Sequence, residues 1–313
     1  MDRPNTPNWY AYVVSFNKSI KPPSEKLLEF IEEEPLGINI LHSCNGLLVC
    51  SNIHVNDYTP SRFYVCNPTT RRYLKLPQLD EKLGILKTMC EMVLALDPSK
   101  SPHYKVVCVL GLGLDNQYEF EVYSSLTGSW SKCGETFTAQ VNFHNGVYWN
   151  GAIHWISFAE TGKSIYLNPD DQVTRVMPKP PILNSPYPTR NCYFGESCGY
   201  LHYIDVYRYQ FKFNVYEMRS DYSEWYFMYI VDLSNVVSSF VHPFMTVCTL
   251  VRGEKEDDSF LVFEMMGKMV RYNFFDKTRE TIHDPEAVEN RLVDPVAKLR
   301  TATLQYIESL CSI

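Results

Sequence analysis

The chain has 313 residues, a length that is large for one ordinary core. Hydrophobic residues make up 45% of it, with 22 Tyr and 17 Phe, and this composition excludes a disordered chain. A formal net charge of −7, with Lys and Arg scattered along the chain, argues against a nucleic-acid surface, which needs clustered cations. No stretch approaches the ~20 apolar residues of a membrane-spanning helix, and the N-terminus lacks a signal-peptide pattern. We therefore expect a protein of the cytoplasm and/or nucleus, with no membrane or nucleic-acid partner.

The first forty residues predict one strand and one short helix. Residues 9–16, WYAYVVSF, are typical of a strand, and residues 24–31 indicate a helix that Ser24 can cap. Pro35 and Gly37 would end this helix.

From residue 38 onward the pattern is one of short strands separated by turns. One half-hairpin recurs five times, with an aromatic-rich strand, a polar turn and a second strand that carries an apolar anchor. Its aligned tyrosines, separated by 43 to 59 residues, are Tyr64, Tyr123, Tyr166, Tyr216 and Tyr272. Further strands are expected between these copies, including 93–96 with 104–110, and 147–149 with 152–157 across the Asn150-Gly151 hairpin turn.

This period, with about four strands per unit, predicts an all-β fold, a β-propeller of about six four-stranded blades. Five units are visible, and residues 9–16 and 301–310 could complete a sixth. The alternative is a β-sandwich or two stacked β domains. We assign 1–39 to an N-terminal segment and 40–313 to the propeller-like domain. Residues 80–92 and 284–300 indicate surface helices or irregular loops.

Two glycine-containing segments suggest phosphate or dinucleotide sites, but neither has the required spacing. Residues 159–164, AETGKS, have Ser157 where a phosphate loop needs glycine, and a strand pattern follows instead of a helix. The pair Gly111 and Gly113 lacks the third glycine of a dinucleotide fingerprint. Both segments therefore predict turns between strands.

No other pattern predicts a catalytic, metal or cofactor site. The eight histidines are dispersed, and His154 and His202 lie in strand patterns, where packing is the simpler interpretation. The ten cysteines form no CxxC pair and are expected to be reduced thiols. The acidic runs 170–171 and 254–258 predict turns and lack the ligand spacing of a calcium loop. A glycosidase-type pair of catalytic carboxylates, contributed by distant blades, stays open as an alternative.

Several short motifs, in order, carry a resemblance to a known family. They include 43–48 (SCNGLL), 67–71 (NPTTR), 123–130 (YSSLTGSW), 145–155 (NGVYWNGAIHW), 215–218 (VYEM) and 306–310 (YIESL). In these residues the chain resembles the F-box-associated domain of plant F-box proteins, over roughly 40–312. The resemblance implies a propeller-like interaction domain that captures the substrate of an SCF-type ubiquitin ligase. An N-terminal F-box in that family docks a Skp-type adaptor and, through it, a cullin. Residues 1–39 contain no Leu-Pro and only one expected helix, so we expect the adaptor-binding F-box to be absent here.

Two functions of different classes follow. The first is a non-enzymatic protein-interaction module that presents loops to an unknown target protein. Candidate loops are Ser51–Arg62 and Pro178–Arg190, which are long and rich in turn formers. The second is a propeller hydrolase or lyase with a site in the central channel, which would require converging carboxylates or histidines. We favour the first, and we assign no catalytic, cofactor or metal residues.

Overall fold

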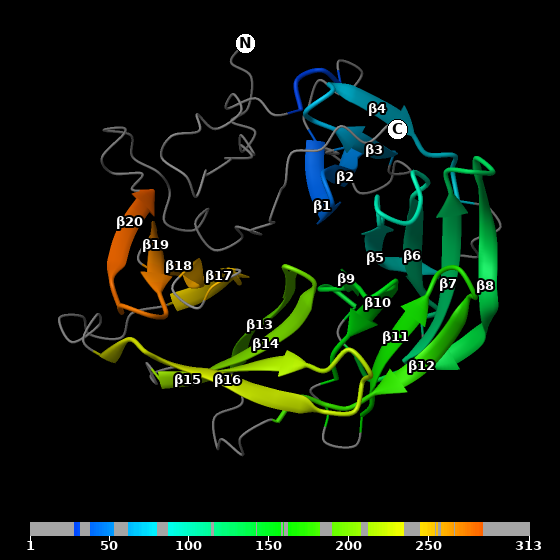
Figure 1. Cartoon of the computed structure of the whole chain (residues 1–313). Coiled ribbons are helices and arrows are strands. Elements are labelled where there is room, and N and C mark those ends of the chain that lie inside the picture. Colours follow the sequence, from blue (N-terminus) through cyan, green and yellow to red (C-terminus); the bar gives the residue numbers. More distant parts are fainter. Residues whose placement is uncertain are drawn as a thin grey trace, which may run out of the picture. The chain divides into compact units, whose positions relative to one another are not determined.

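A computed structural model describes five four-stranded sheets and several of the turns between them (Figure 1). The described residues are 28–31, 38–52, 62–79, 87–113, 116–141, 143–157, 159, 162–181, 190–207, 212–234, 245–253, 255, 258–265 and 267–283. The strands fall into two compact units, one built mainly on sheets 1 and 2 and the other on sheets 3, 4 and 5.

The unit with sheets 1 and 2 contains the first eight strands. Sheet 1 consists of β1 (Ile38–Cys44), β2 (Leu47–Asn52), β3 (Phe63–Asn67) and β4 (Arg72–Lys75). Sheet 2 consists of β5 (Thr88–Ala95), β6 (Lys105–Gly111), β7 (Gln117–Ser124) and β8 (Ser129–Thr138). The strands β1 and β2 pack against β5.

The second unit contains three sheets. Sheet 3 consists of β9 (Val147–Trp149), β10 (Ala152–Trp155), β11 (Ser164–Asn168) and β12 (Val173–Met177). Sheet 4 consists of β13 (Arg190–Ser197), β14 (Tyr200–Tyr207), β15 (Lys212–Met218) and β16 (Trp225–Asp232). Sheet 5 consists of β17 (Met245–Val251), β18 (Phe260–Met265), β19 (Lys268–Asn273) and β20 (Arg279–His283). The strand β13 packs against both β9 and β17.

Every sheet is an antiparallel meander, in which strands next to each other in the chain are also neighbours in the sheet. This connectivity needs only short turns, and it is the architecture of a propeller blade. All five expected half-hairpins are confirmed as the third and fourth strands of a sheet. The five aligned tyrosines all lie on third strands, namely β3, β7, β11, β15 and β19.

The turns explain why the sequence forms these hairpins. Sheets 1, 3 and 4 begin with two-residue turns whose residues both have positive φ, as the type I′ geometry requires. The first residues of these turns are Asn45 (φ 43°), Asn150 (φ 48°) and Cys198 (φ 52°), each followed by glycine. Asparagine and glycine tolerate this conformation, whereas cysteine rarely adopts it.

A second left-handed residue recurs between the third and fourth strand of every sheet. These residues are Arg71 (φ 54°), Gly128 (φ 69°), Gln172 (φ 56°), Tyr222 (φ 61°) and Lys277 (φ 60°). Since only one of the five is glycine, the turn geometry is held by its surroundings. In sheets 3 and 5 the side-chain oxygens of Asn168 and Asn273 accept hydrogen bonds from the amides two residues further on, at 2.8 Å each.

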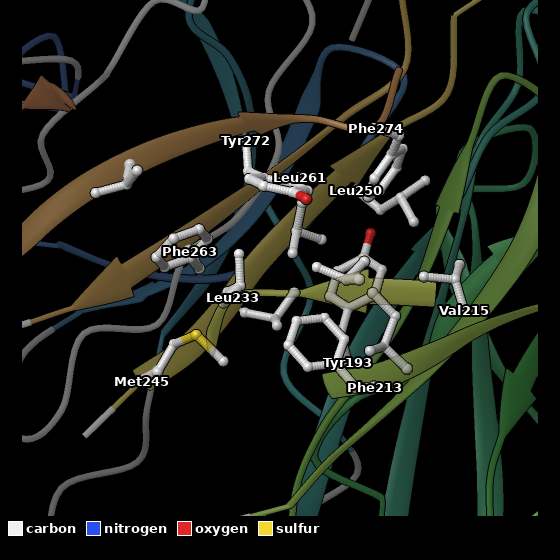
Figure 2. Packing of buried hydrophobic residues seen from close by; sticks show 14 residues of the cluster. Tyr193, Phe213, Val215, Leu233, Met245, Leu250, Leu261, Phe263, Tyr272 and Phe274 are labelled. Atoms are coloured by element: carbon white, nitrogen blue, oxygen red, sulfur yellow. The ribbon is translucent and has the colours of Figure 1, made fainter. Parts of the chain in front are cut away.

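The largest described hydrophobic cluster lies between sheets 4 and 5 (Figure 2). Sheet 4 contributes Tyr193, Ile204, Phe213 and Val215, and sheet 5 contributes Leu250, Leu261, Phe263 and Tyr272, among others. Alternate residues of each strand therefore point into the cluster, as the period of two dictates. Burial of these side chains is the main force that holds the two sheets together.

Polar contacts also join neighbouring sheets, and some recur. The Asn45 side-chain amide donates to the Leu96 carbonyl just after β5, at 2.7 Å. The Cys198 thiol donates to the Arg252 carbonyl just after β17, at 2.8 Å. These two contacts are topologically equivalent, because each runs from the first hairpin turn of one sheet to the end of the first strand of the next.

A second recurring contact is made by tryptophan. Trp130 in β8 donates to the Pro77 carbonyl at 2.8 Å, and Trp225 in β16 donates to the Pro178 carbonyl at 3.0 Å. In each case a fourth strand is joined to a proline one or two residues beyond the fourth strand of the preceding sheet. Blade-to-blade contacts are thus part of the sequence repeat.

Three expectations need correction or stay open. About six blades were expected and five sheets are described, because residues 9–16 and 301–310, expected to complete a sixth, lie outside the described residues. The expected helix 24–31 is described only at 28–31, where it is a turn closed by the Ile31 amide on the Leu28 carbonyl (3.1 Å).

The expected surface helix at 80–92 is wrong from Thr88 onward, where β5 begins. Residues 88–92 instead pair with β6, as in Met92 opposite Cys108, and this pairing outweighs the weak local preference. The expected strand 93–96 is confirmed, because Val93 lies opposite Val107 in the same pair of strands. Residues 284–300 lie outside the described residues. None of the described helical residues forms a helix long and apolar enough to span a membrane.

Candidate functional site

The first loop proposed from sequence, Ser51–Arg62, is described at its base. The Asn52 amide donates to the Arg62 carbonyl at 3.1 Å, and the Arg62 amide donates to the Asn52 side-chain oxygen at 2.8 Å. Both strands that flank the loop are therefore held together up to its ends. Residues 53–61 lie outside the described residues, and a binding role for this loop stays a prediction.

The second proposed loop, Pro178–Arg190, is also described only near its beginning. The Pro178 carbonyl accepts the Trp225 indole hydrogen bond, and the Lys179 ammonium donates to the Ala159 carbonyl at 2.6 Å. Residues 182–189 lie outside the described residues, so this prediction is likewise untested.

The structure reveals a polar cluster that the sequence did not indicate, centred on the buried carboxylate of Glu217 in β15. Its side chain is 1% exposed and has three neighbours that can donate. His202 Nε2 lies 3.2 Å from Glu217 Oε2, Arg252 Nη1 donates to the same oxygen, and the Tyr226 hydroxyl donates to Oε1. These residues come from three strands of sheet 4 and from the residue that follows β17 in sheet 5.

The hydrogen bonds determine the charge of this cluster. Burial by itself favours the neutral acid, but hydrogen bonds from His202, Tyr226 and Arg252 outweigh it and lower the pKa of Glu217. Burial and the hydrogen bond to Glu217 together raise the pKa of Tyr226 to about 12. At neutral pH, Glu217 is therefore an ionised carboxylate that is satisfied by a guanidinium and a neutral phenol.

Two arginines at this cluster lie over tyrosine rings. The Arg252 guanidinium carbon is 3.6 Å from the centroid of the Tyr200 ring, and that of Arg219 is 5.3 Å from the Tyr226 ring. The main chain of Arg252 is also fixed, because its amide donates to Ser197 Oγ at 2.9 Å and its carbonyl accepts from the Cys198 thiol. We call Tyr200, Arg219, Glu217, Tyr226 and Arg252 the Tyr200–Arg252 surface.

A neighbouring aromatic group joins sheets 3 and 4 and accounts for one histidine singled out in the sequence. His154 is fully buried and stacks on Tyr166 and Tyr222, with ring centroids 5.3 and 5.6 Å away. Its Nδ1 lies 3.2 Å from the Val147 carbonyl, which can only accept, so Nδ1 carries the hydrogen and Nε2 accepts from the Tyr222 hydroxyl at 2.9 Å. His154 is thus a hydrogen-bonded core residue.

The other sequence motifs lie where turns were predicted. The AETGKS segment connects β10 to β11, where a Cβ on Gly162 would clash with the Ser157 side chain. Gly111 ends β6, and Gly113 has a φ of 84° in the turn that follows. Within the described ranges, no group of three or more His, Cys, Asp or Glu side chains is arranged to hold a metal. The eight cysteines whose side chains the structure describes are free thiols.

One sequence signal could have identified Glu217. In β15 the residues Phe213, Val215 and Glu217 alternate along one face of the strand, and the first two are buried in the core between sheets 4 and 5. A charged residue that continues a buried apolar alternation must have a partner. The partner, Arg252, is 35 positions away, and the sequence gives no indication of it.

These features define a class: an all-β scaffold of four-stranded antiparallel meanders with firmly anchored turns. Comparison with known proteins gives the family. The F-box associated beta propeller domain matches residues 8–172. An F-box protein of Arabidopsis thaliana is 30% identical over 307 residues, covering 88% of this chain and 70% of that protein. A second Arabidopsis thaliana F-box protein is 28% identical over 151 residues, covering 44% of this chain and 40% of its own length. The chain belongs to the plant F-box-associated β-propeller family.

Solved structures with a similar arrangement of strands are distant. One from a study of two prolyl endopeptidases is 12% identical with a TM-score of 0.46, covering 83% of this chain and 38% of that chain. An oligogalacturonate lyase from Vibrio parahaemolyticus is 11% identical with a TM-score of 0.42, covering 79% of each chain. Likeness at this level carries no argument about function.

Proposed function

We propose that this chain is a non-enzymatic protein-interaction module that captures a target protein for ubiquitin-dependent degradation, as the substrate receptor of an SCF-type ligase. The observation that carries this proposal is the similarity to an F-box protein along 88% of the chain. The anchored loop bases support it, because binding loops work best on rigid strands.

The proposal has two separable parts, target capture and recruitment of the ligase. Recruitment would require an F-box that docks a Skp-type adaptor and, through it, a cullin, and we expected residues 1–39 not to form one. Target capture needs only the sheets and their loops. We place both activities in the cytoplasm and/or nucleus.

The test is proximity labelling and co-purification in plant cells, with the chain as it stands and with an added F-box. We expect both forms to label the same target proteins, and only the F-box form to retain the adaptor and to lower the abundance of the targets. Retention of the adaptor by the chain as it stands would contradict the expected absence of an F-box. A chain that enriches no protein over an unrelated β-propeller would refute target capture.

A further inference from the structure

We propose that the Tyr200–Arg252 surface binds an acidic peptide segment of the partner protein. The inference rests on the proposed interaction function and adds to it the site and the chemistry of the partner. It needs only residues within the unit formed by sheets 3, 4 and 5.

The guanidinium of Arg252 has hydrogen-bond capacity beyond what this cluster uses. A guanidinium carries five N–H donors in a planar fork. Within the described residues its contacts are the Glu217 carboxylate, the Tyr226 hydroxyl and the Tyr200 ring. Because the side chain is 23% exposed, the remaining donors can reach an acceptor from outside, and a carboxylate matches the fork best.

The donors are also held in position before a partner arrives. The stack on Tyr200, the hydrogen bond to Glu217 and the two main-chain hydrogen bonds of Arg252 restrict its rotamers. Binding therefore loses less side-chain entropy than it would at a free surface arginine. Arginine and tyrosine are also among the residues that are enriched at the energetic centre of protein interfaces.

The neighbouring residues favour a peptide over a small anion. The Tyr200 side chain is 41% exposed and offers an aromatic surface to an apolar residue next to the acidic one. Arg219 is 53% exposed, and its partner Glu224 is 61% exposed, at 2.9 Å. An exposed ion pair of this kind contributes little, so Arg219 can turn to a second carboxylate. The expected ligand carries Asp or Glu beside an aliphatic or aromatic residue.

The experiment is a selection of displayed random peptides of about twelve residues on the full chain. We expect the selected peptides to be enriched in Asp or Glu next to an apolar residue. Synthetic copies of these peptides should bind the Arg252→Lys and Tyr200→Leu variants about tenfold more weakly than the unchanged chain. Lys keeps the charge beside Glu217 but lacks the planar fork of donors, and Leu lacks the aromatic ring. The Lys replacement is conservative and Tyr200 is exposed, so we expect both variants to fold, and thermal melting of each variant checks this.

The matched control is Arg175→Lys in β12, since Arg175 also pairs with a carboxylate, Asp171, at 2.6 Å in another turn of the same unit. This variant should bind the peptides as the unchanged chain does. Peptides without an acidic preference, peptides rich in Lys or Arg, no selected peptide, or equal binding by the two test variants would each overturn the inference.

The same variants separate this inference from the proposed function. If Arg252→Lys and Tyr200→Leu still capture the cellular targets, the interaction module stands and this surface is the wrong one. If the unchanged chain captures no protein in cells, the proposed function fails whatever the peptides show.

Discussion

Acidification should weaken the contact between sheets 3 and 4 through His154. This imidazole is buried between the rings of Tyr166 and Tyr222, and burial lowers its pKa from 6.5 to about 4, although the hydrogen bond to the Val147 carbonyl favours the proton. The neutral form is therefore the native form. In the unfolded chain the same residue takes up a proton near its ordinary pKa.

The sign and size follow from proton linkage. Below pH 6.5 the unfolded chain binds one proton more than the folded chain, so the free energy of unfolding falls as pH falls, until the folded pKa is reached. Between pH 7.5 and 5.0 the loss from this residue is about 2 kcal/mol. The loss of stability is negligible above pH 7.5, and it levels off only below pH 4, once His154 is protonated in the folded chain as well.

The assay is urea unfolding followed by tryptophan fluorescence at several pH values between 7.5 and 5.0. The His154→Gln variant should be less stable at pH 7.5, because it loses the ring stack, yet it should lose about 2 kcal/mol less than the unchanged chain on acidification. His103→Gln, at an exposed position, is the matched control and should keep the full pH dependence. An equal pH dependence for His154→Gln and the unchanged chain would refute a buried neutral His154.

Four further substitutions test the backbone and the packing, three of them in turns and one, at Gly195, in the strand β13. Cys198→Asn should raise the free energy of unfolding by about 1 kcal/mol, measured by thermal or urea unfolding. Asn adopts positive φ more readily than Cys, and its amide donates more strongly than a thiol to the Arg252 carbonyl. A loss of stability would contradict the equivalence of this turn with the turn at Asn45. Arg71→Gly should stabilise the fold by about 0.5 to 1 kcal/mol, because glycine adopts positive φ without strain. Gly128→Ala should destabilise the fold by about 1 kcal/mol through its backbone alone, since a Cβ there meets nothing within 4 Å. The same sign for both changes would show that positive φ does not determine the stability of these turns. Gly195→Ala should destabilise by about 1 to 3 kcal/mol, because its Cβ would meet the buried Tyr193 ring, and an unchanged melting temperature would show that the ring moves freely.

The repeat made most of the fold predictable from sequence. A tyrosine such as Tyr64 or Tyr272 marks a third strand because the strand before the turn must place a large side chain against the neighbouring layer at every repeat. The Asn150-Gly151 turn was predictable because few residue pairs accept two positive φ angles in succession. Local rules of this kind depend only on residues that are close in the chain.

What could not be predicted depends on residues far apart in the chain. Thr88–Met92 has one β-branched residue, and only its pairing with β6 makes it part of a strand. The pairing of Glu217 with Arg252 could not be predicted, because Arg252 reaches it from the next sheet. Tyr222 occupies a left-handed position that no sequence rule assigns to tyrosine, and it is held there by His154 and Tyr166.

The unusual hairpin turn of sheet 4 also provides a chemical handle. Among the eight cysteines whose side chains are described, Cys198 is exposed, five are buried and two are intermediate. Among these eight, a thiol-reactive dye added briefly should therefore label Cys198 first, since access limits thiol reactivity. Because Cys198 lies two positions from Tyr200, the emission wavelength or intensity of the attached fluorophore should change when a ligand binds. The labelled protein could then be used to screen for binding partners by fluorescence.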